Sequence, residues 1–156
     1  LDVVNYRHVP QGPGVMLISH EVNYAMDHAE GRFGLLAQRK LGRAAHLPAA
    51  VAELVRLSLE FADLLENDLR VEGALKFEAG AFEFAANDRL AAPNTDAAFA
   101  ALLPQVQAAA ESIYPGRGAT VTRVANDPRE RLALRVDSGQ SLEIDDVIDA
   151  VEALEQ

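Results

Sequence analysis

Apolar and polar side chains alternate through the first forty residues, a pattern typical of β-strands. Val3–Val9 and Val15–Val22 are rich in residues that favour strands. The five residues between them, 10–14, include two prolines and two glycines, which favour a loop. We therefore expect these two stretches to form a β-hairpin.

A second hairpin is predicted immediately afterwards. The stretches 24–28 and 33–40 flank four residues that include Gly31, which can adopt the positive φ of a tight turn. This register places Lys40 opposite Glu21, where the two side chains can form a cross-strand ion pair. No strand breaker follows the first loop until this turn, so the second and third strands can also be one long strand.

After Pro48 the polar positions recur every three or four residues, as they do along a helix. Proline suits the first turn of a helix, because its missing N–H has no partner there. Aliphatic residues fill the rest of the segment, which predicts a helix with a broad buried face. The expected polar stripe consists of Glu53, Arg56, Glu60, Asp63 and Asn67.

Alternation returns in two short stretches on either side of Ala79 and Gly80. If these two residues form the turn, 75–78 and 81–86 are the arms of a third hairpin, with its apolar pairs on one face. The expected cross-strand pairs are Phe77 with Phe82, Lys76 with Glu83 and Leu75 with Phe84.

A second helix is predicted to begin after Thr95, whose hydroxyl suits an N-cap. Its apolar residues follow the helical repeat as far as Tyr114, after which proline and glycine end it. Pro104 lies inside this helix and lacks the N–H that the backbone needs, so we expect a kink or a break near 100–103.

A fourth hairpin is predicted from 119–125 and 131–136, around the turn 126–128. Ser141 is the expected cap of a last helix. The apolar side of that helix is formed by Ile144, Val147, Ile148, Val151 and Leu154.

This order of elements predicts an α+β fold. We expect about 6–8 strands in a mainly antiparallel, hairpin-connected sheet, with two or three helices packed on one face. The chain is interpreted as one domain, 1–156, with a β-rich part (1–46), two helix–hairpin units (47–136) and a C-terminal acidic helix (141–154). A Gly-Ala step precedes each of the two hairpins in 47–136, which suggests that the helix–hairpin unit is duplicated.

Composition narrows the classes of function. The 156 residues include no cysteine, which excludes thiol catalysis, disulfides and cysteine zinc sites. The net charge of −10 disfavours nucleic-acid binding, and no apolar stretch reaches the ~20 residues of a membrane span. Because the sequence begins at Leu1, a targeting segment can precede it, and the cytoplasm is the default expectation.

The first third of the chain holds the residues best suited to bind a ligand. If Val9 faces Val15 in the first hairpin, Tyr6 and His20 are diagonal neighbours, roughly 7–8 Å apart. The candidate ligand-binding residues are Tyr6, His20, Tyr24 and Arg39. Aromatic rings with polar tips suit a small polar-aromatic ligand, but they are more often found at the margin of a core.

A metal site and catalytic motifs are disfavoured. His20 and His28 point to the same side but lie eight residues apart, roughly 26 Å along a strand, so they cannot share one ion. Ser19 and Glu21 point away from His20, which rules out a local triad. We expect no metal and no cofactor.

Negative charge is concentrated at the C-terminal end of the sequence. Residues 137–156 hold seven acidic side chains and no basic one, whereas Arg123, Arg131 and Arg135 are expected on one outer face of the fourth hairpin. This arrangement suggests charge complementarity within the chain or between two copies. The polar segments 87–89 and 94–95 are explained mainly by turn and capping roles.

Two functions follow from these observations. The leading hypothesis is a non-catalytic binding or assembly module that works as a homodimer, because catalytic constellations are missing and a small sheet has edges that must be covered. The alternative is a small-ligand-binding protein or an enzyme that uses the pocket on the first sheet, with His20 as acid and base.

Overall fold

The computed structural model describes residues 2–9, 14–27, 33–40, 45–71 and 73–153. It confirms an α+β fold, with seven strands and three helices in the described residues, and all strand pairs are antiparallel. The strands divide into two sheets rather than one. The strands are β1 (Asp2–Asn5), β2 (Val15–Ile18), β3 (Val22–Asp27), β4 (Gly34–Arg39), β5 (Ala81–Ala85), β6 (Thr120–Arg123) and β7 (Ala133–Asp137), and the helices are α1 (Leu47–Glu66), α2 (Asp96–Ile113) and α3 (Ile144–Glu152).

Contacts group the chain into two compact units. The first, here called the N-terminal unit, comprises 1–45 and 53–77, and the second, the C-terminal unit, comprises 46–52 and 78–156. The single-domain assignment stays a prediction. No described helix is long and apolar enough to cross a membrane.

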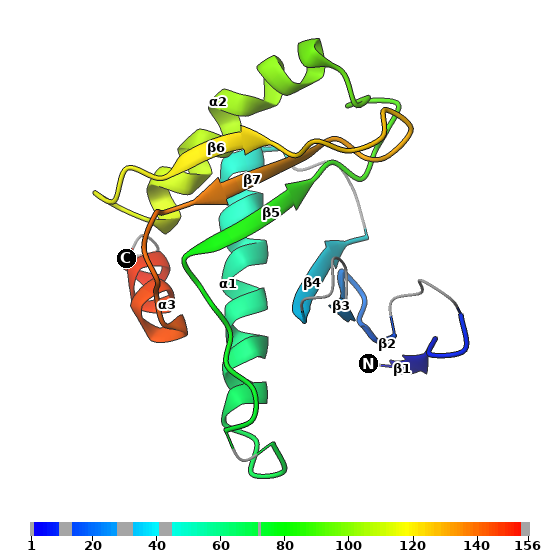
Figure 1. The fold of residues 1–156 in the computed structure, drawn as a ribbon, viewed down its shortest axis with the longest axis vertical. Helices are drawn as coiled ribbons and strands as arrows, with labels where there is room; N and C mark the ends of the chain where they lie inside the picture. Colours follow the sequence, from blue (N-terminus) through cyan, green and yellow to red (C-terminus); the bar gives the residue numbers. More distant parts are fainter. Residues whose placement is uncertain (1, 10–13, 28–32, 41–44, 72, 154–156) are drawn as a thin grey trace. The chain divides into compact units, whose positions relative to one another are not determined.

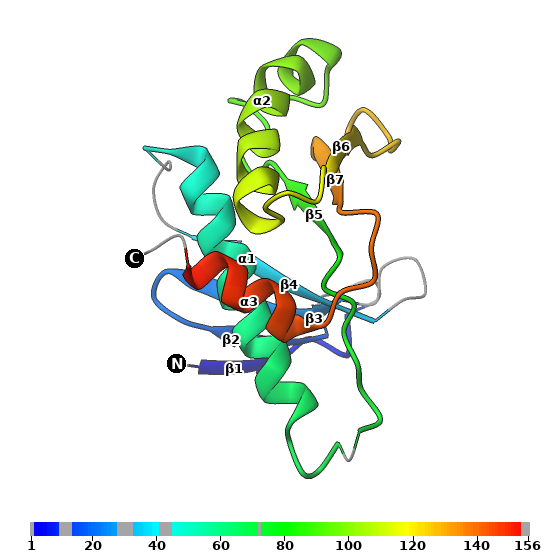
Figure 2. The ribbon, with the colours of Figure 1, turned by 90° about the vertical axis from the view of Figure 1, so that its left-hand side faces the viewer.

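The N-terminal unit contains a sheet of order β1-β2-β3-β4, and Figure 2 shows these strands together with α1. The predicted register of the second hairpin is confirmed. Val22 pairs with Arg39, and the N–H of Lys40 donates to the carbonyl of Glu21 at 2.8 Å. The Lys40 ammonium donates to the carbonyl of Ser19 at 3.0 Å. The turn around Gly31 lies outside the described residues.

The single long strand suggested for positions 15–28 is wrong, because the chain reverses between β2 and β3. Ser19 makes this turn: its hydroxyl donates to the carbonyl of Val22 at 2.5 Å and accepts the N–H of Val22 at 3.2 Å. A serine side chain can replace backbone partners in this way, and so can end a strand without proline or glycine. Leu17 is consequently opposite Tyr24.

The predicted register of the first hairpin is also wrong, by four residues. Val4 pairs with Met16 rather than with His20. The hairpin closes earlier than expected because the N–H of Tyr6 donates to the carbonyl of Gly14 at 2.6 Å, and the φ of Gly14 is 67°. Glycine adopts this left-handed conformation without steric cost, so the chain can turn into β2 at that residue.

Helix α1 has the predicted polar stripe. Within it Arg56 and Glu60 form an ion pair one turn apart, and the Asn67 amide donates to the Asp63 carboxylate at 2.7 Å. The helix contacts the sheet through this stripe as well as through Phe61: Glu53 pairs with Arg39 of β4 at 3.5 Å, and the ring of Phe61 lies 5.2 Å from the ring of Tyr24 in β3. The part of α1 in the N-terminal unit is thus attached to the sheet by an ion pair and by aromatic packing.

In the C-terminal unit β7 is the central strand of the order β5-β7-β6, and α2 lies over one face of this sheet (Figure 1). The fourth predicted hairpin is confirmed as β6–β7. Its register places Arg123 beside Leu134, which is fully buried, so the expectation that Arg123 shares the face of Arg135 is wrong. The side chains fully or almost fully buried in α2 and β7 are Val106, Ala109, Ala110, Ile113, Leu134 and Val136.

The predicted hairpin of 75–78 with 81–86 is wrong. β5 pairs with β7 instead, with Phe82 opposite Val136. The segment before β5 is held elsewhere, since Glu66 accepts the N–H of Phe77 at 2.5 Å and the ammonium of Lys76 at 3.0 Å. The duplicated helix–hairpin unit is therefore wrong too, because only the second helix is followed by a hairpin within the described residues.

The caps of the later helices agree only in part with the prediction. Thr95 caps α2 and accepts the N–H of Ala98 at 3.3 Å, as expected. Helix α2 continues without a break through Pro104, which is exposed, so the carbonyl that loses its donor can bind water.

Helix α3 begins after Glu143 rather than Ser141, whose hydroxyl donates to Glu78 at 2.7 Å. Leu154 lies outside the described residues.

Candidate functional site

The structure separates Tyr6 from His20. Tyr6 follows β1 and bonds to Gly14, whereas His20 is exposed in the turn between β2 and β3. The corrected register removes the diagonal contact that suggested a shared pocket, because the end of β2 now lies opposite Asp2. A ligand site that uses these residues stays a prediction.

Tyr24 and Arg39 are brought together on one face of the N-terminal sheet, since Val22 pairs with Arg39 two residues from Tyr24. Arg39 forms an ion pair with Glu53 of α1 at 3.5 Å. Burial, followed by the charge of Glu60, raises the pKa of the Tyr24 phenol. Both side chains thus contact α1, and the phenol keeps its proton at neutral pH.

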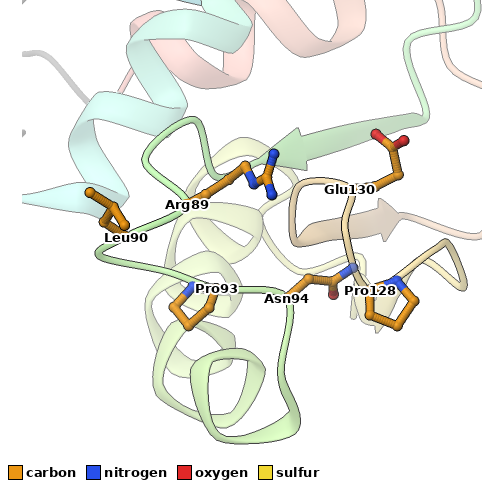
Figure 3. Close-up of a pocket in the computed structure, with 6 residues that line it drawn as sticks. All are labelled: Arg89, Leu90, Pro93, Asn94, Pro128 and Glu130. Carbon is orange, nitrogen blue, oxygen red and sulfur yellow. The ribbon is translucent and has the colours of Figure 1, made fainter.

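The C-terminal unit contains a hollow of about 400 Å³ between two loops. One loop, 86–95, connects β5 to α2, and the other, 124–132, connects β6 to β7. Figure 3 shows the hollow with four lining residues on the first loop and two on the second. The lining residues are Arg89, Leu90, Pro93, Asn94, Pro128 and Glu130.

Asn94 joins the two loops. Its side-chain amide donates to Oδ1 of Asn126 at 2.7 Å and to the carbonyl of Asp127 at 3.2 Å. Its own Oδ1 accepts a hydrogen bond from Arg123 at 2.8 Å, and Arg123 also forms an ion pair with Asp96 at the start of α2. Asn94 is only 9% exposed, so this network holds a buried amide with its donors and acceptor satisfied.

Each loop is also ordered by its own aspartate. The carboxylate of Asp88 accepts the N–H groups of Leu90 and Ala91, both at 3.0 Å. On the other loop Asp127 accepts the N–H of Arg129 at 2.9 Å and pairs with its guanidinium. Hydrogen bonds from the side chain and backbone of Arg129 lower the pKa of Asp127, so this turn keeps its negative acceptor at neutral pH.

The chemistry of the hollow suits binding more than catalysis. Two prolines and Leu90 supply apolar surface, and Leu90 is 98% exposed. Arg89 and Glu130 supply one charge of each sign, and neither forms an ion pair with any described residue. The six lining residues include no histidine and no hydroxyl nucleophile.

Sequence reasoning missed this site, because turn and capping roles accounted for its polar residues one at a time. The two polar turn segments, 87–89 and 126–128, are visible in the sequence, but that they meet follows only from the structure, in which the two preceding strands both pair with β7. Strands that pair with the same neighbour in the same direction bring their following loops to one end of a sheet.

Among the residues that the structure describes, no group of three or more histidine, cysteine, aspartate or glutamate side chains is placed to hold a metal ion. His28 is not among the described residues. In comparisons with protein-family models, curated proteins and solved structures, the chain matched none.

Proposed function

We propose that this protein is a non-catalytic binding module that works as a homodimer, and that the hollow of the C-terminal unit is its binding surface. The observation that carries the proposal is the position of Leu90, fully presented to solvent at the rim of a hollow lined by two prolines. Burying one leucine side chain contributes about 1.5–3 kcal/mol to association.

Single exposed leucines are common on protein surfaces and need no partner. Leu90 differs because its backbone is held by Asp88 and its loop is tied to the next loop by Asn94. Ordering a loop at the moment of binding costs free energy, and a loop that is already ordered avoids that cost. The loop that forms the rim of the hollow therefore does not need to be ordered when a partner binds.

The proposal is tested by sedimentation velocity at micromolar concentrations on the wild-type chain and two variants. We expect the wild type to sediment as a dimer and Leu90→Asp to shift it towards the monomer. Leu69→Asp is the matched control, because Leu69 is 88% exposed in the N-terminal unit and should leave the dimer unchanged. A wild-type chain that remains strictly monomeric would overturn the proposal.

A further inference from the structure

We infer that the hollow is complementary to itself, so that two copies of this chain join about a twofold axis with Leu90 of each copy in the hollow of the other. In this arrangement Arg89 pairs with the partner's Glu130, and Glu130 pairs with the partner's Arg89. The inference rests on the proposed function and specifies the geometry of its interface.

The two charges at the hollow carry the first step. Arg89 and Glu130 lie on different loops, and Figure 3 shows the Arg89 side chain extending towards the loop that carries Glu130. Neither forms a salt bridge with a described residue, although the charge of Glu130 acts on the adjacent Arg129, whose own salt bridge is with Asp127. A twofold axis turns one unpaired arginine and one unpaired glutamate into two reciprocal ion pairs.

The local charge balance carries the second step. The whole chain has a net charge of −10, so two copies repel each other on average. The segments 87–96 and 123–131, which form and support the hollow, carry four basic and four acidic side chains. Two copies can therefore approach through this end of the sheet without net repulsion.

Shape carries the third step. The hollow of about 400 Å³ has room for a leucine side chain, and the rings of Pro93 and Pro128 give it apolar walls. Leu90 is on the rim of the same hollow. One surface of the chain therefore provides both the projecting leucine and the hollow that receives it. This is the requirement for an interface in which both copies use the same surface.

The test reverses the two charges separately and together. We expect Arg89→Glu and Glu130→Arg each to weaken the dimer about tenfold or more, since each single variant places like charges together at both contacts. A 1:1 mixture of the two variants should recover a dimer, because every contact then joins opposite charges. The double variant Arg89→Glu/Glu130→Arg should recover its own dimer for the same reason.

The controls are Arg70→Glu and Glu111→Arg, which change the net charge equally at exposed positions that do not line the hollow. Both should keep the wild-type dissociation constant. A wild-type monomer would show that the proposed function fails. A dimer whose affinity is unchanged by either reversal would leave that function standing and overturn the reciprocal pairing. Assemblies larger than 1:1 in the mixture would overturn the twofold arrangement.

Discussion

The side-chain amide of Asn94 donates to Oδ1 of Asn126 at 2.7 Å, across 32 residues of sequence. This bond ties the loop before α2 to the loop between β6 and β7. Because Asn94 also accepts from Arg123, one buried side chain determines the spacing of the two walls of the hollow.

Replacing Asn94 by alanine should therefore loosen both loops. The change removes the three hydrogen bonds that the buried Asn94 amide makes to Asn126, Asp127 and Arg123, and each such bond contributes about 0.5–1.5 kcal/mol to the free energy of unfolding. It should also weaken dimer formation, because the loops then have to be ordered on binding. Urea denaturation followed by circular dichroism measures the first effect and sedimentation the second. Asn87→Ala, at an exposed position of the same loop, should change the unfolding free energy by less than about 0.5 kcal/mol.

Replacing Gly80 by alanine should destabilise the C-terminal unit. A Cβ at this position would lie 2.0 Å from the carbonyl oxygen of Gln140, so the backbone that leads to α3 would have to move. Such overpacking costs about 1–3 kcal/mol. Gly34→Ala is the matched control, since a Cβ there meets no atom within 4 Å. A Gly80→Ala variant that melts at the wild-type temperature would refute this reading of the contact.

Replacing Tyr114 by phenylalanine should lower the free energy of unfolding by about 1–3 kcal/mol. The hydroxyl of Tyr114 donates to the carbonyl of Ala79 at 2.8 Å, and both residues are buried, so its removal leaves a carbonyl without a donor. Chemical denaturation measures the loss. Tyr6→Phe, at a partly exposed position, should have a much smaller effect.

Tyr114 also predicts a dependence on alkaline pH. Burial raises its pKa well above the ordinary value of 10.0, with further contributions from Asp137 and Glu78. A folded-state pKa above the unfolded one gives stability that is complete below about pH 10 and declines as the pH rises further. Unfolding measurements above pH 10 should show this decline in the wild type and a smaller one in Tyr114→Phe. If the free energy of unfolding declined equally with pH in the two proteins, the decline would not come from Tyr114.

Glu78 predicts the opposite dependence at acid pH. Hydrogen bonds from Ser141, Leu142 and Gly80, in that order, lower its pKa below the ordinary value of 4.5. A folded-state pKa below the unfolded one gives stability that is present above pH 4.5 and is lost as the pH falls through the folded value. Glu78→Gln should therefore flatten the acid limb of the stability profile. Glu111→Gln, on the exposed side of α2, should leave it unchanged.

Local features of the sequence predicted most of the elements. The hydroxyl of Thr95 identified the start of α2, and the polar repeat from Glu53 identified the polar stripe of α1, because caps and helical periodicity depend on residues within a few positions. The register of β3 with β4 was correct for a similar reason: a short turn leaves few ways to align its two arms.

Partners distant in sequence were not predictable in this way. Alternation in 81–86 indicated a strand but not which strand it joins, and Phe82 pairs with Val136 rather than with Phe77. The register of β1 pairs Asn5 with Val15, and the bond from Tyr6 to Gly14 continues it into the loop, which no periodicity reveals. The hollow was missed because its lining residues belong to two loops that are distant in sequence and adjacent only in the folded chain.

The sequence by itself determined the α+β class and the positions of the three helices, which follow from the period of the side chains, and the antiparallel character of the strands, which follows from short connections between them. Only the tertiary structure decided the division into two sheets, the partner of β5 and the network around Asn94. The physical reason is that periodicity states which face of an element is buried, whereas the partner that buries it is selected by packing across the whole chain.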